Sequence, residues 1–143
     1  MIKELSSSNV KDILSLDFEF SDSWTESEFV SGFNNGRFFV LGCVINDEIV
    51  GYIAYSLGFD TADVEGIAVK TRFRRNGIAK SLYKEAEARL ISKNIEKVFL
   101  EVRESNFSAK NLYENLGFSQ ISLRKKYYSD GENAVVMCKE LKK

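Results

Sequence analysis

The sequence contains no histidine and only two cysteines, and these shortages exclude several kinds of active site. Without histidine, the usual Ser-His and Cys-His catalytic pairs are excluded. Cys43 and Cys138 lie in apolar, strand-like runs without metal-ligand spacing, so we expect no metal site. No base motif lies near either thiol, which argues against an acyl-cysteine intermediate. Two unpaired thiols fit a reducing compartment, so we expect a cytoplasmic protein.

Long apolar runs and an excess of one charge are also missing. No stretch approaches the about 18 consecutive apolar residues of a membrane span, and no signal-peptide core opens the chain, so we expect no membrane association. The formal net charge is −1, so no overall basic field indicates nucleic acid as a partner. The 143 residues, 44% hydrophobic and 29% charged, are enough for one soluble domain over residues 1–143.

Apolar patterning predicts seven strands and four helices. The predicted strands are residues 2–5, 37–45, 49–59, 61–69, 97–103, 118–127 and 133–141. The predicted helices are residues 9–20 with Asn9 as N-cap, 25–33 with a Thr25–Glu28 capping box, 77–93, and one that Ser105 or Asn106 caps and Gly117 ends.

The order of these elements predicts the fold class. The strand, helix and strand across residues 64–103 form a βαβ unit, so its two strands should be parallel with a right-handed crossover. The other strands follow one another through short turns, as antiparallel hairpins do. We therefore predict a mixed α/β fold with a central, mostly antiparallel sheet, a parallel pair in its middle and helices on both faces.

The most informative stretch is the turn that joins the first strand of this unit to its helix. Arg72, Arg74 and Arg75 follow the strand, and Asn76-Gly77 open the helix. A helix N-terminus carries partial positive charge and free N–H groups, and glycine lets a ligand approach the backbone. This pattern fits either a phosphate or pyrophosphate site or a solvated basic loop. GxxxxGK[ST] and GxGxxG are absent, so neither a P-loop nor a dinucleotide fingerprint is present.

Two segments resemble the GCN5-related N-acetyltransferase (GNAT) family. The first is Arg74 to Ala79, RRNGIA, which matches R/Q-x-x-G-x-G/A after the strand residues IAV. The second is Leu100 to Phe118, LEVRESNFSAKNLYENLGF. With R-x-x-Y-Y at Arg124 to Tyr128, the chain is most similar to bacterial ribosomal-protein alanine N-acetyltransferases. It departs from them at Ser23 and Ser129, where proline is usual, both on the acceptor side.

The resemblance implies a role for each matching residue. Acetyl-CoA would be held by backbone groups of Ile67, Ala68 and Val69, by the segment Arg75, Asn76, Gly77, Ile78, Ala79 and Lys80, and by Asn106. Glu101 would act as general base, and Tyr113 would return a proton to the CoA thiolate. Trp24, Tyr127 and Tyr128 are candidates for the acceptor pocket, although each could instead be a packing residue.

The chemistry of acyl transfer to an amine agrees with these roles. It needs a neutral amine, which a carboxylate such as Glu101 can generate, and a proton for the leaving thiolate. A tyrosine has an ordinary pKa of about 10, so Tyr113 is protonated at neutral pH. Glu101 could alternatively be a surface carboxylate paired with Arg103 or Lys97, and Tyr113 a core aromatic.

We therefore expect an enzyme that transfers acetyl from acetyl-CoA to a protein N-terminal α-amine, such as the alanine of a ribosomal protein, by direct attack in a ternary complex. An α-amine has a pKa of about 8 and lysine about 10.4, so freeing lysine at neutral pH costs about 3 kcal/mol more. The alternatives are acetylation of lysine or of a small amine, for which Asp60, Asp63 and Glu65 could form an acidic cleft.

Two hypotheses of other classes remain. One is a non-catalytic acyl-CoA-binding module, against which the set of Glu101, Asn106 and Tyr113 argues. The other is a nucleic-acid-binding module, which the slightly acidic composition disfavours. For the enzyme we expect a monomer or a weak homodimer.

Overall fold

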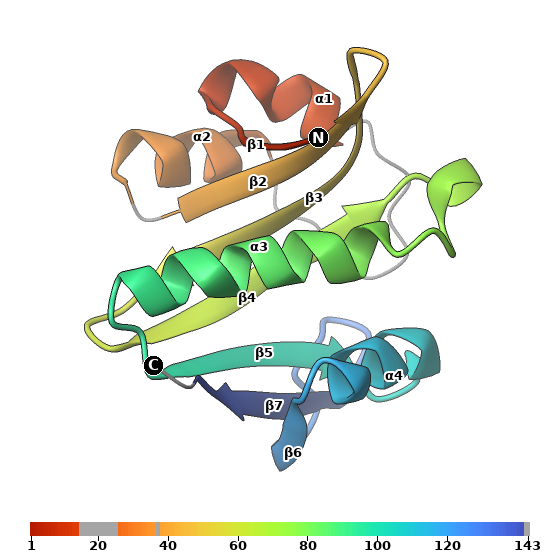
Figure 1. The fold of residues 1–143 in the computed structure, drawn as a ribbon. Coiled ribbons are helices and arrows are strands. Elements are labelled where there is room, and N and C mark those ends of the chain that lie inside the picture. The colour runs from red at the N-terminus through yellow and green to blue at the C-terminus, as the bar shows by residue number, and fades with distance from the viewer. Residues whose placement is uncertain (15–25, 37, 142–143) are drawn as a thin grey trace.

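The computed structural model describes residues 1–14, 26–36 and 38–141, with side chains omitted for 26–29. Strands and helices are mixed along the chain, with β2, β3 and β4 in succession before α3 (Figure 1). The strands are β1 (Ile2–Glu4), β2 (Phe38–Ile45), β3 (Glu48–Leu57), β4 (Thr61–Val69), β5 (Lys97–Arg103), β6 (Ser119–Arg124) and β7 (Ala134–Glu140). The helices are α1 (Val10–Leu14), α2 (Glu26–Asn34), α3 (Ile78–Ser92) and α4 (Phe107–Asn115), with 3-10 turns η1 (Ser7–Asn9) and η2 (Thr71–Phe73).

All of these strands belong to one sheet, in the order β1-β2-β3-β4-β5-β7-β6. Every neighbouring pair is antiparallel except β4 and β5, which are parallel. The helix α3 connects these two strands, as the βαβ pattern predicts (Figure 1). The predicted mixed α/β fold is confirmed. The final hairpin folds so that β7, and not β6, lies beside β5.

The parallel pairing of β4 and β5 is short. It joins Thr61–Val64 to Lys97–Leu100, although β4 continues to Val69 and β5 to Arg103. A bulge lies just beyond the last pair, because Tyr55 and Ala54 of β3 pair with Val64 and Gly66 and leave Glu65 as the extra residue. Position 66 suits glycine, because a Cβ added to Gly66 would lie only 3.3 Å from the Tyr52 hydroxyl oxygen. The two strands therefore separate after Val64.

Buried side chains form a separate core on each face of the sheet. Leu82, Tyr83, Ala86 and Leu90 of α3 and Ala109 and Tyr113 of α4 share one core with Ile53 and Tyr55. On the other face, Val10 and Ile13 of α1 pack with the alternate β3 residues Tyr52 and Ala54. Successive strand residues point to opposite faces, so β3 contributes to both cores. Helices therefore cover both faces, as predicted.

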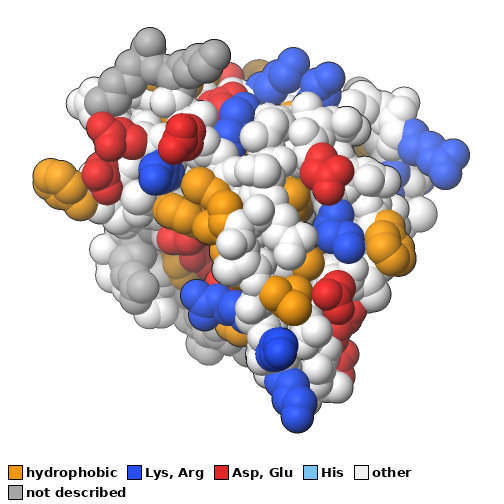
Figure 2. Space-filling model, turned by 90° about the horizontal axis from the view of Figure 1, so that it is seen from below, with side chains coloured by type: hydrophobic (Ala, Val, Ile, Leu, Met, Phe, Trp, Pro, Cys, Tyr) orange, Lys and Arg blue, Asp and Glu red, His pale blue; other side chains and the backbone are white. Residues whose placement is uncertain are grey.

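Figure 2 shows the molecule from below the view of Figure 1. Apolar, basic and acidic side chains are interspersed on this face, without one continuous basic patch. The exposed large apolar side chains of the described chain include Phe107 on α4 and Ile121 and Leu123 on β6. Within the described residues, none of the helices has the length and apolarity needed to cross a membrane.

Three local predictions need correction. The N-cap before α1 is Ser6, not Asn9, because a 3-10 turn precedes the helix and the Asn9 side chain accepts a hydrogen bond from the Ser6 backbone N–H at 3.0 Å. The strand predicted to reach Tyr127 ends at Arg124, since Lys126 adopts a φ of +53°. The predicted hairpin turn is tighter than residues 46–48, because Ile45 already pairs with Glu48. Residues 15–20 of the first predicted helix and Thr25 lie outside the described residues.

The end of α4 agrees with its prediction. Gly117 has a φ of +101°, and the Phe118 backbone N–H bonds to the Tyr113 carbonyl at 2.9 Å. The Phe118 ring folds back against the Tyr113 ring, with centroids 5.7 Å apart. This is the glycine-terminated helix end with its apolar contact.

Replacing this glycine should destabilise the protein. Gly117→Ala forces a left-handed conformation on a residue with a Cβ and places that atom 3.1 Å from Lys139 Cε. We expect the free energy of unfolding in urea to fall by about 1–2 kcal/mol. Glu114→Ala, on the exposed side of α4, should change it by less than about 0.5 kcal/mol. Equal stability of the two variants would contradict this account of the helix end.

Candidate active site

The turn between β4 and α3 is held by its own side chains. The Arg74 Nε donates to the Val69 carbonyl at 2.9 Å, and the Asn76 side-chain amide donates to the Phe73 carbonyl at 3.2 Å. Arg75 and Gly77 adopt left-handed backbone conformations, with φ values of +67° and +74°. A Cβ added at Gly77 would meet nothing within 4 Å, so the space beside this backbone is open. The first turn of α3 therefore faces an accessible surface.

A cavity of about 630 Å³, called here the turn cavity, lies against this turn and α4. Its lining residues are Val69, Thr71, Phe73, Arg74, Arg75, Gly77, Ile78, Ala79, Lys80, Ser108 and Leu112. They include six of the ten residues predicted to bind acetyl-CoA. The basic groups, the start of a helix and an apolar wall together suit a ligand with a phosphate end and an extended apolar arm.

The other four predicted cofactor residues lie elsewhere. Ala68 is fully buried in the core under α1, and Asn76 is turned to Phe73. Asn106 is the N-cap of α4, where its Oδ1 accepts a hydrogen bond from the Ala109 N–H at 3.1 Å. Ile67 lines a different cavity. Their contacts with acetyl-CoA stay predictions.

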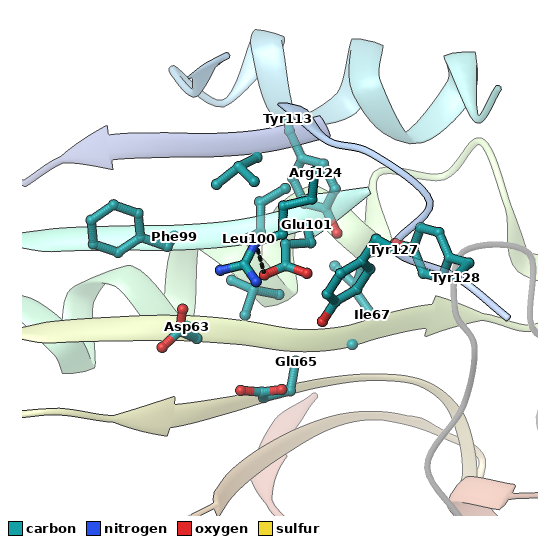
Figure 3. A pocket seen from close by; sticks show the side chains of 13 residues that line it. Asp63, Glu65, Ile67, Phe99, Leu100, Glu101, Tyr113, Arg124, Tyr127 and Tyr128 are labelled. Atoms are coloured by element: carbon teal, nitrogen blue, oxygen red, sulfur yellow. Dashed lines mark ion pairs between the residues drawn. The ribbon is translucent and has the colours of Figure 1, made fainter. Parts of the chain in front are cut away.

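The second cavity, called here the Glu101 cavity, has a volume of about 470 Å³ (Figure 3). Its polar lining comes from Asp63 and Glu65 on β4, Glu101 on β5, Tyr113 on α4, and the segment from Arg124 to Tyr128. Glu101 points away from Leu100 and Val102, which pack in the core under α3 and α4. The predicted base therefore lies on the sheet face opposite those helices.

Glu101 has two partners that its local sequence does not indicate. The Arg124 Nε lies 3.5 Å from Glu101 Oε1, and the Tyr127 side chain lies on the same side of this carboxylate, where both line the cavity. Interaction with the Glu101 carboxylate raises the pKa of Tyr127 above its usual value, because a nearby negative acceptor favours the protonated phenol. The alternative pairing of Glu101 with Arg103 or Lys97 is wrong. Arg103 pairs with Asp130 and Glu132, and Lys97 with Glu140.

Tyr113 is both a core residue and a cavity residue. Its side chain is 5% exposed and contacts Phe118 edge to face, as the periodicity of α4 predicts. It also reaches the Glu101 cavity, although Leu112 beside it lines the turn cavity. Burial raises the pKa of its phenol, so the hydroxyl stays protonated at neutral pH.

The two cavities meet the opening between β4 and β5 from opposite sides. Ile67 lines the Glu101 cavity, and Val69, two residues further along β4, lines the turn cavity. On α4, Tyr113 lines the Glu101 cavity, whereas Leu112 and Ser108 line the turn cavity. The separation of the strands after Val64 leaves the space through which Tyr113 reaches the far side. The two cavities therefore lie against neighbouring residues of β4 and of α4.

Two acidic residues give the Glu101 cavity a negative character. Burial raises the pKa of Asp63, the nearby Glu101 charge raises it further, and Arg124 opposes the shift. Glu65 accepts a hydrogen bond from the Ser56 hydroxyl at 2.9 Å. Asp60, the third acidic residue that the sequence suggested, does not line this cavity.

The remaining candidates have clear outcomes. Tyr127 and Tyr128 both line the Glu101 cavity, and their rings touch edge to face at 5.1 Å. Trp24 lies outside the described residues. Cys43 is buried, and burial raises the pKa of Cys138, so neither is an activated nucleophile. The described residues contain no cluster of acidic and cysteine side chains able to hold a metal ion.

Comparison with known proteins gives one consistent result. Residues 8–118 match the model of the Acetyltransferase (GNAT) family. The chain is 38% identical over 105 residues to the ribosomal protein bS18-alanine N-acetyltransferase of Haemophilus influenzae, covering 71% of each protein. It is 35% identical over 118 residues to an N-alpha-acetyltransferase of Saccharolobus solfataricus, covering 73% of this chain and 69% of that protein. The crystal structure of the ribosomal-protein-S18-alanine N-acetyltransferase from Escherichia coli matches with a TM-score of 0.89 and 26% identity, covering 100% and 94%.

The contact between Tyr127 and Glu101 predicts a shift in a titration. In Glu101→Gln the neutral amide no longer favours the protonated phenol, so the pKa of Tyr127 should fall toward its ordinary value. The ¹³Cζ signal of Tyr127, followed by NMR against pH, measures this shift. Glu104→Gln changes a nearby exposed carboxylate that bonds Asn133 and should leave the titration unchanged. An unchanged pKa of Tyr127 in Glu101→Gln would contradict an interaction between this phenol and the Glu101 carboxylate.

Proposed function

Because the chain belongs to the acetyltransferase (GNAT) family, we propose that this N-acetyltransferase moves acetyl from acetyl-CoA to a protein N-terminal α-amine. The proposed acceptor is the N-terminal alanine of a ribosomal protein, attacked directly in a ternary complex. The observation that supports the proposal is that Glu101 and Tyr113 line one cavity, while the turn cavity lies against neighbouring residues of β4 and α4. Relatives named for ribosomal-protein alanine and for protein α-amines support the choice of acceptor.

The turn cavity has the features that acetyl-CoA needs. The open backbone at Gly77 and the start of α3 would hold the pyrophosphate, with Arg75 and Lys80 beside it. Val69, Ile78 and Leu112 offer an apolar wall for the pantetheine arm. When bound, acetyl-CoA supplies the activated acetyl group as a thioester. No other cofactor is required.

Glu101 would remove the proton from the acceptor ammonium. Its carboxylate faces the cavity, with the Arg124 Nε 3.5 Å away and Tyr127 lining the same space. The side chain is 28% exposed, so an amine can reach it from the cavity directly or through one water.

Tyr113 would hold the proton that the departing thiolate needs. Its hydroxyl is protonated at neutral pH, because burial raises the pKa of the phenol. Tyr113 lines the Glu101 cavity, so a group bound there can reach it.

One carboxylate without a histidine suits an acceptor that loses its proton easily. An α-amine has a pKa of about 8 and a lysine side chain about 10.4, so lysine costs about 3 kcal/mol more to deprotonate at neutral pH. This difference favours the α-amine over lysine.

A second candidate function is acetylation of a small amine that carries another positive group. Asp63 and Glu65 favour it, because they place two carboxylates in the cavity besides Glu101. A polyamine or an aminoglycoside could use both. A protein N-terminus has only one amine, although its following side chains could meet the same carboxylates.

One peptide distinguishes these functions. It carries an N-terminal alanine and one internal lysine, and it is offered with acetyl-CoA and analysed by fragment mass spectrometry. We expect acetyl on the alanine nitrogen alone, and none when that amine is blocked beforehand. Acetyl on lysine would contradict the proposal. If no product forms while calorimetry shows acetyl-CoA binding, transfer to a polyamine would favour the second function, and its absence would favour a non-catalytic module.

The role of Tyr113 predicts a difference between two buried tyrosines. Tyr113 and Tyr83 both contact Phe118 edge to face, at 5.7 and 5.4 Å, but only Tyr113 lines a described cavity. Tyr113→Phe should lower kcat by about 100-fold and leave the affinity for acetyl-CoA within about twofold. Tyr83→Phe should leave kcat unchanged. Similar kcat values for the two variants would show that Tyr113 only packs.

A further inference from the structure

Arg103 and Glu101 occupy neighbouring positions on one face of β5. Residues two apart on a strand point the same way, so both side chains face the connection between β6 and β7, residues 125–133. Glu101 and Tyr127 line the same cavity, and the Glu101 carboxylate raises the pKa of Tyr127, while the Arg103 guanidinium lies 4.1 Å from the centre of the Tyr128 ring. Two adjacent side chains of the strand therefore each contact one of two adjacent tyrosines.

Arg103 also ties the far end of this connection to the strand. Its Nη1 donates to Asp130 Oδ2 at 2.8 Å and to Glu132 Oε1 at 3.0 Å. The arginine side chain is 25% exposed, so these pairs are partly shielded from solvent. The pKa of Asp130 is lowered first by the Glu132 backbone N–H, and that of Glu132 first by Ser105; the Arg103 hydrogen bonds lower both further.

The two carboxylates that bind Arg103 also accept hydrogen bonds from backbone N–H groups. Asp130 Oδ1 accepts from the Glu132 N–H at 3.0 Å, and Glu132 Oε2 accepts from the Ser105 N–H at 2.9 Å. The Tyr128 N–H bonds to the Glu132 carbonyl at 3.2 Å. The Arg103 guanidinium is planar. It can donate hydrogen bonds to both carboxylates from its edge while its flat face stacks on the Tyr128 ring.

Tyr127 depends on Tyr128 for its place. It is 49% exposed, and its contacts are the Tyr128 ring at 5.1 Å, the Glu101 carboxylate and the Arg124 guanidinium, whose centre lies 5.4 Å from the ring. A side chain with so much exposure has little packing of its own to fix it. Its position beside the proposed base follows from that of the segment that carries it.

We infer that Arg103 is a positioning residue for the acceptor: it fixes the β6–β7 connection so that Tyr128 and Tyr127 form the wall of the cavity beside Glu101. The inference rests on the proposed function for its kinetic consequence. Arg103 touches neither reacting group, and it acts on acceptor binding through the two tyrosines. Acetyl-CoA would bind on the other side of the opening between β4 and β5, so replacing Arg103 should not change its affinity.

The kinetic test compares Arg103→Met with Arg89→Met, using the alanine peptide. Arg89 also contacts two carboxylates, Glu85 at 3.4 Å and Glu4 at 3.7 Å, but lies on the last turn of α3. Arg103→Met should raise KM for the peptide at least tenfold, with KM for acetyl-CoA within twofold. Arg103→Lys should recover only part of the loss, because an ammonium cannot bind both carboxylates and stack on a ring. An unchanged peptide KM, or equal effects on both substrates, would overturn the inference.

Two measurements without substrates separate this inference from the proposed function. Hydrogen exchange of the Tyr128 and Glu132 amides should accelerate at least tenfold in Arg103→Met and stay unchanged in Arg89→Met. The pKa of Tyr127 should fall in Arg103→Met, because the phenol moves away from Glu101. If neither changes, Arg103 does not position the tyrosines, whatever the enzyme acetylates. If both change but the wild-type protein acetylates no peptide, the proposed acceptor is wrong and the positioning role stands.

Discussion

The constraint on which the site depends is the brief pairing of β4 with β5. Parallel neighbours in a sheet normally bond along their shared length, but these two bond only from Thr61–Val64 to Lys97–Leu100. The bulge at Glu65 and Gly66 bends β4 just where the pairing stops. Polar backbone groups beyond that point lack their sheet partners, and buried backbone groups need partners. A ligand lying in the opening can supply them, which is why the separated strands are suited to an extended amide-bearing arm.

The same separation sets which element supplies which chemical group. The start of α3 and the arginine-rich turn lie on one side of the opening, and Glu101 with the β6–β7 connection lies on the other. Helix α4 belongs to the first side, yet Tyr113 extends to the second. A proton donor at that point can serve a leaving group arriving from either direction. A continuous parallel pair would close this route.

Local sequence patterns predicted most of the fold and about half of the site. The bounds of β4 and β5 agree to the residue, because each is a run of strand-forming residues ended by a charged turn. Asn106 and Gly117 mark the ends of α4 for equally local reasons. The partners of Glu101 could not be predicted in this way. Arg124 comes from β6, which β7 separates from β5, so the contact joins residues of two strands that are not neighbours in the sheet. The early end of β6 at Arg124, which frees Tyr127 for the cavity, depends on one left-handed residue, Lys126.

The charges around the Glu101 cavity impose opposite demands on an acceptor amine. Asp63 and Glu65 attract an ammonium group, and by the same interaction they raise its pKa and oppose the loss of its proton. Arg124 counters this effect beside Glu101, the proposed base. The arrangement also costs stability. Because the pKa of Asp63 is raised on folding, the folded state binds its proton more tightly than the unfolded state, and stability falls as pH rises past the unfolded pKa. A cationic acceptor would offset that cost while it is bound. The balance suits an amine whose proton is weakly held, since a strongly basic amine would stay charged among these carboxylates.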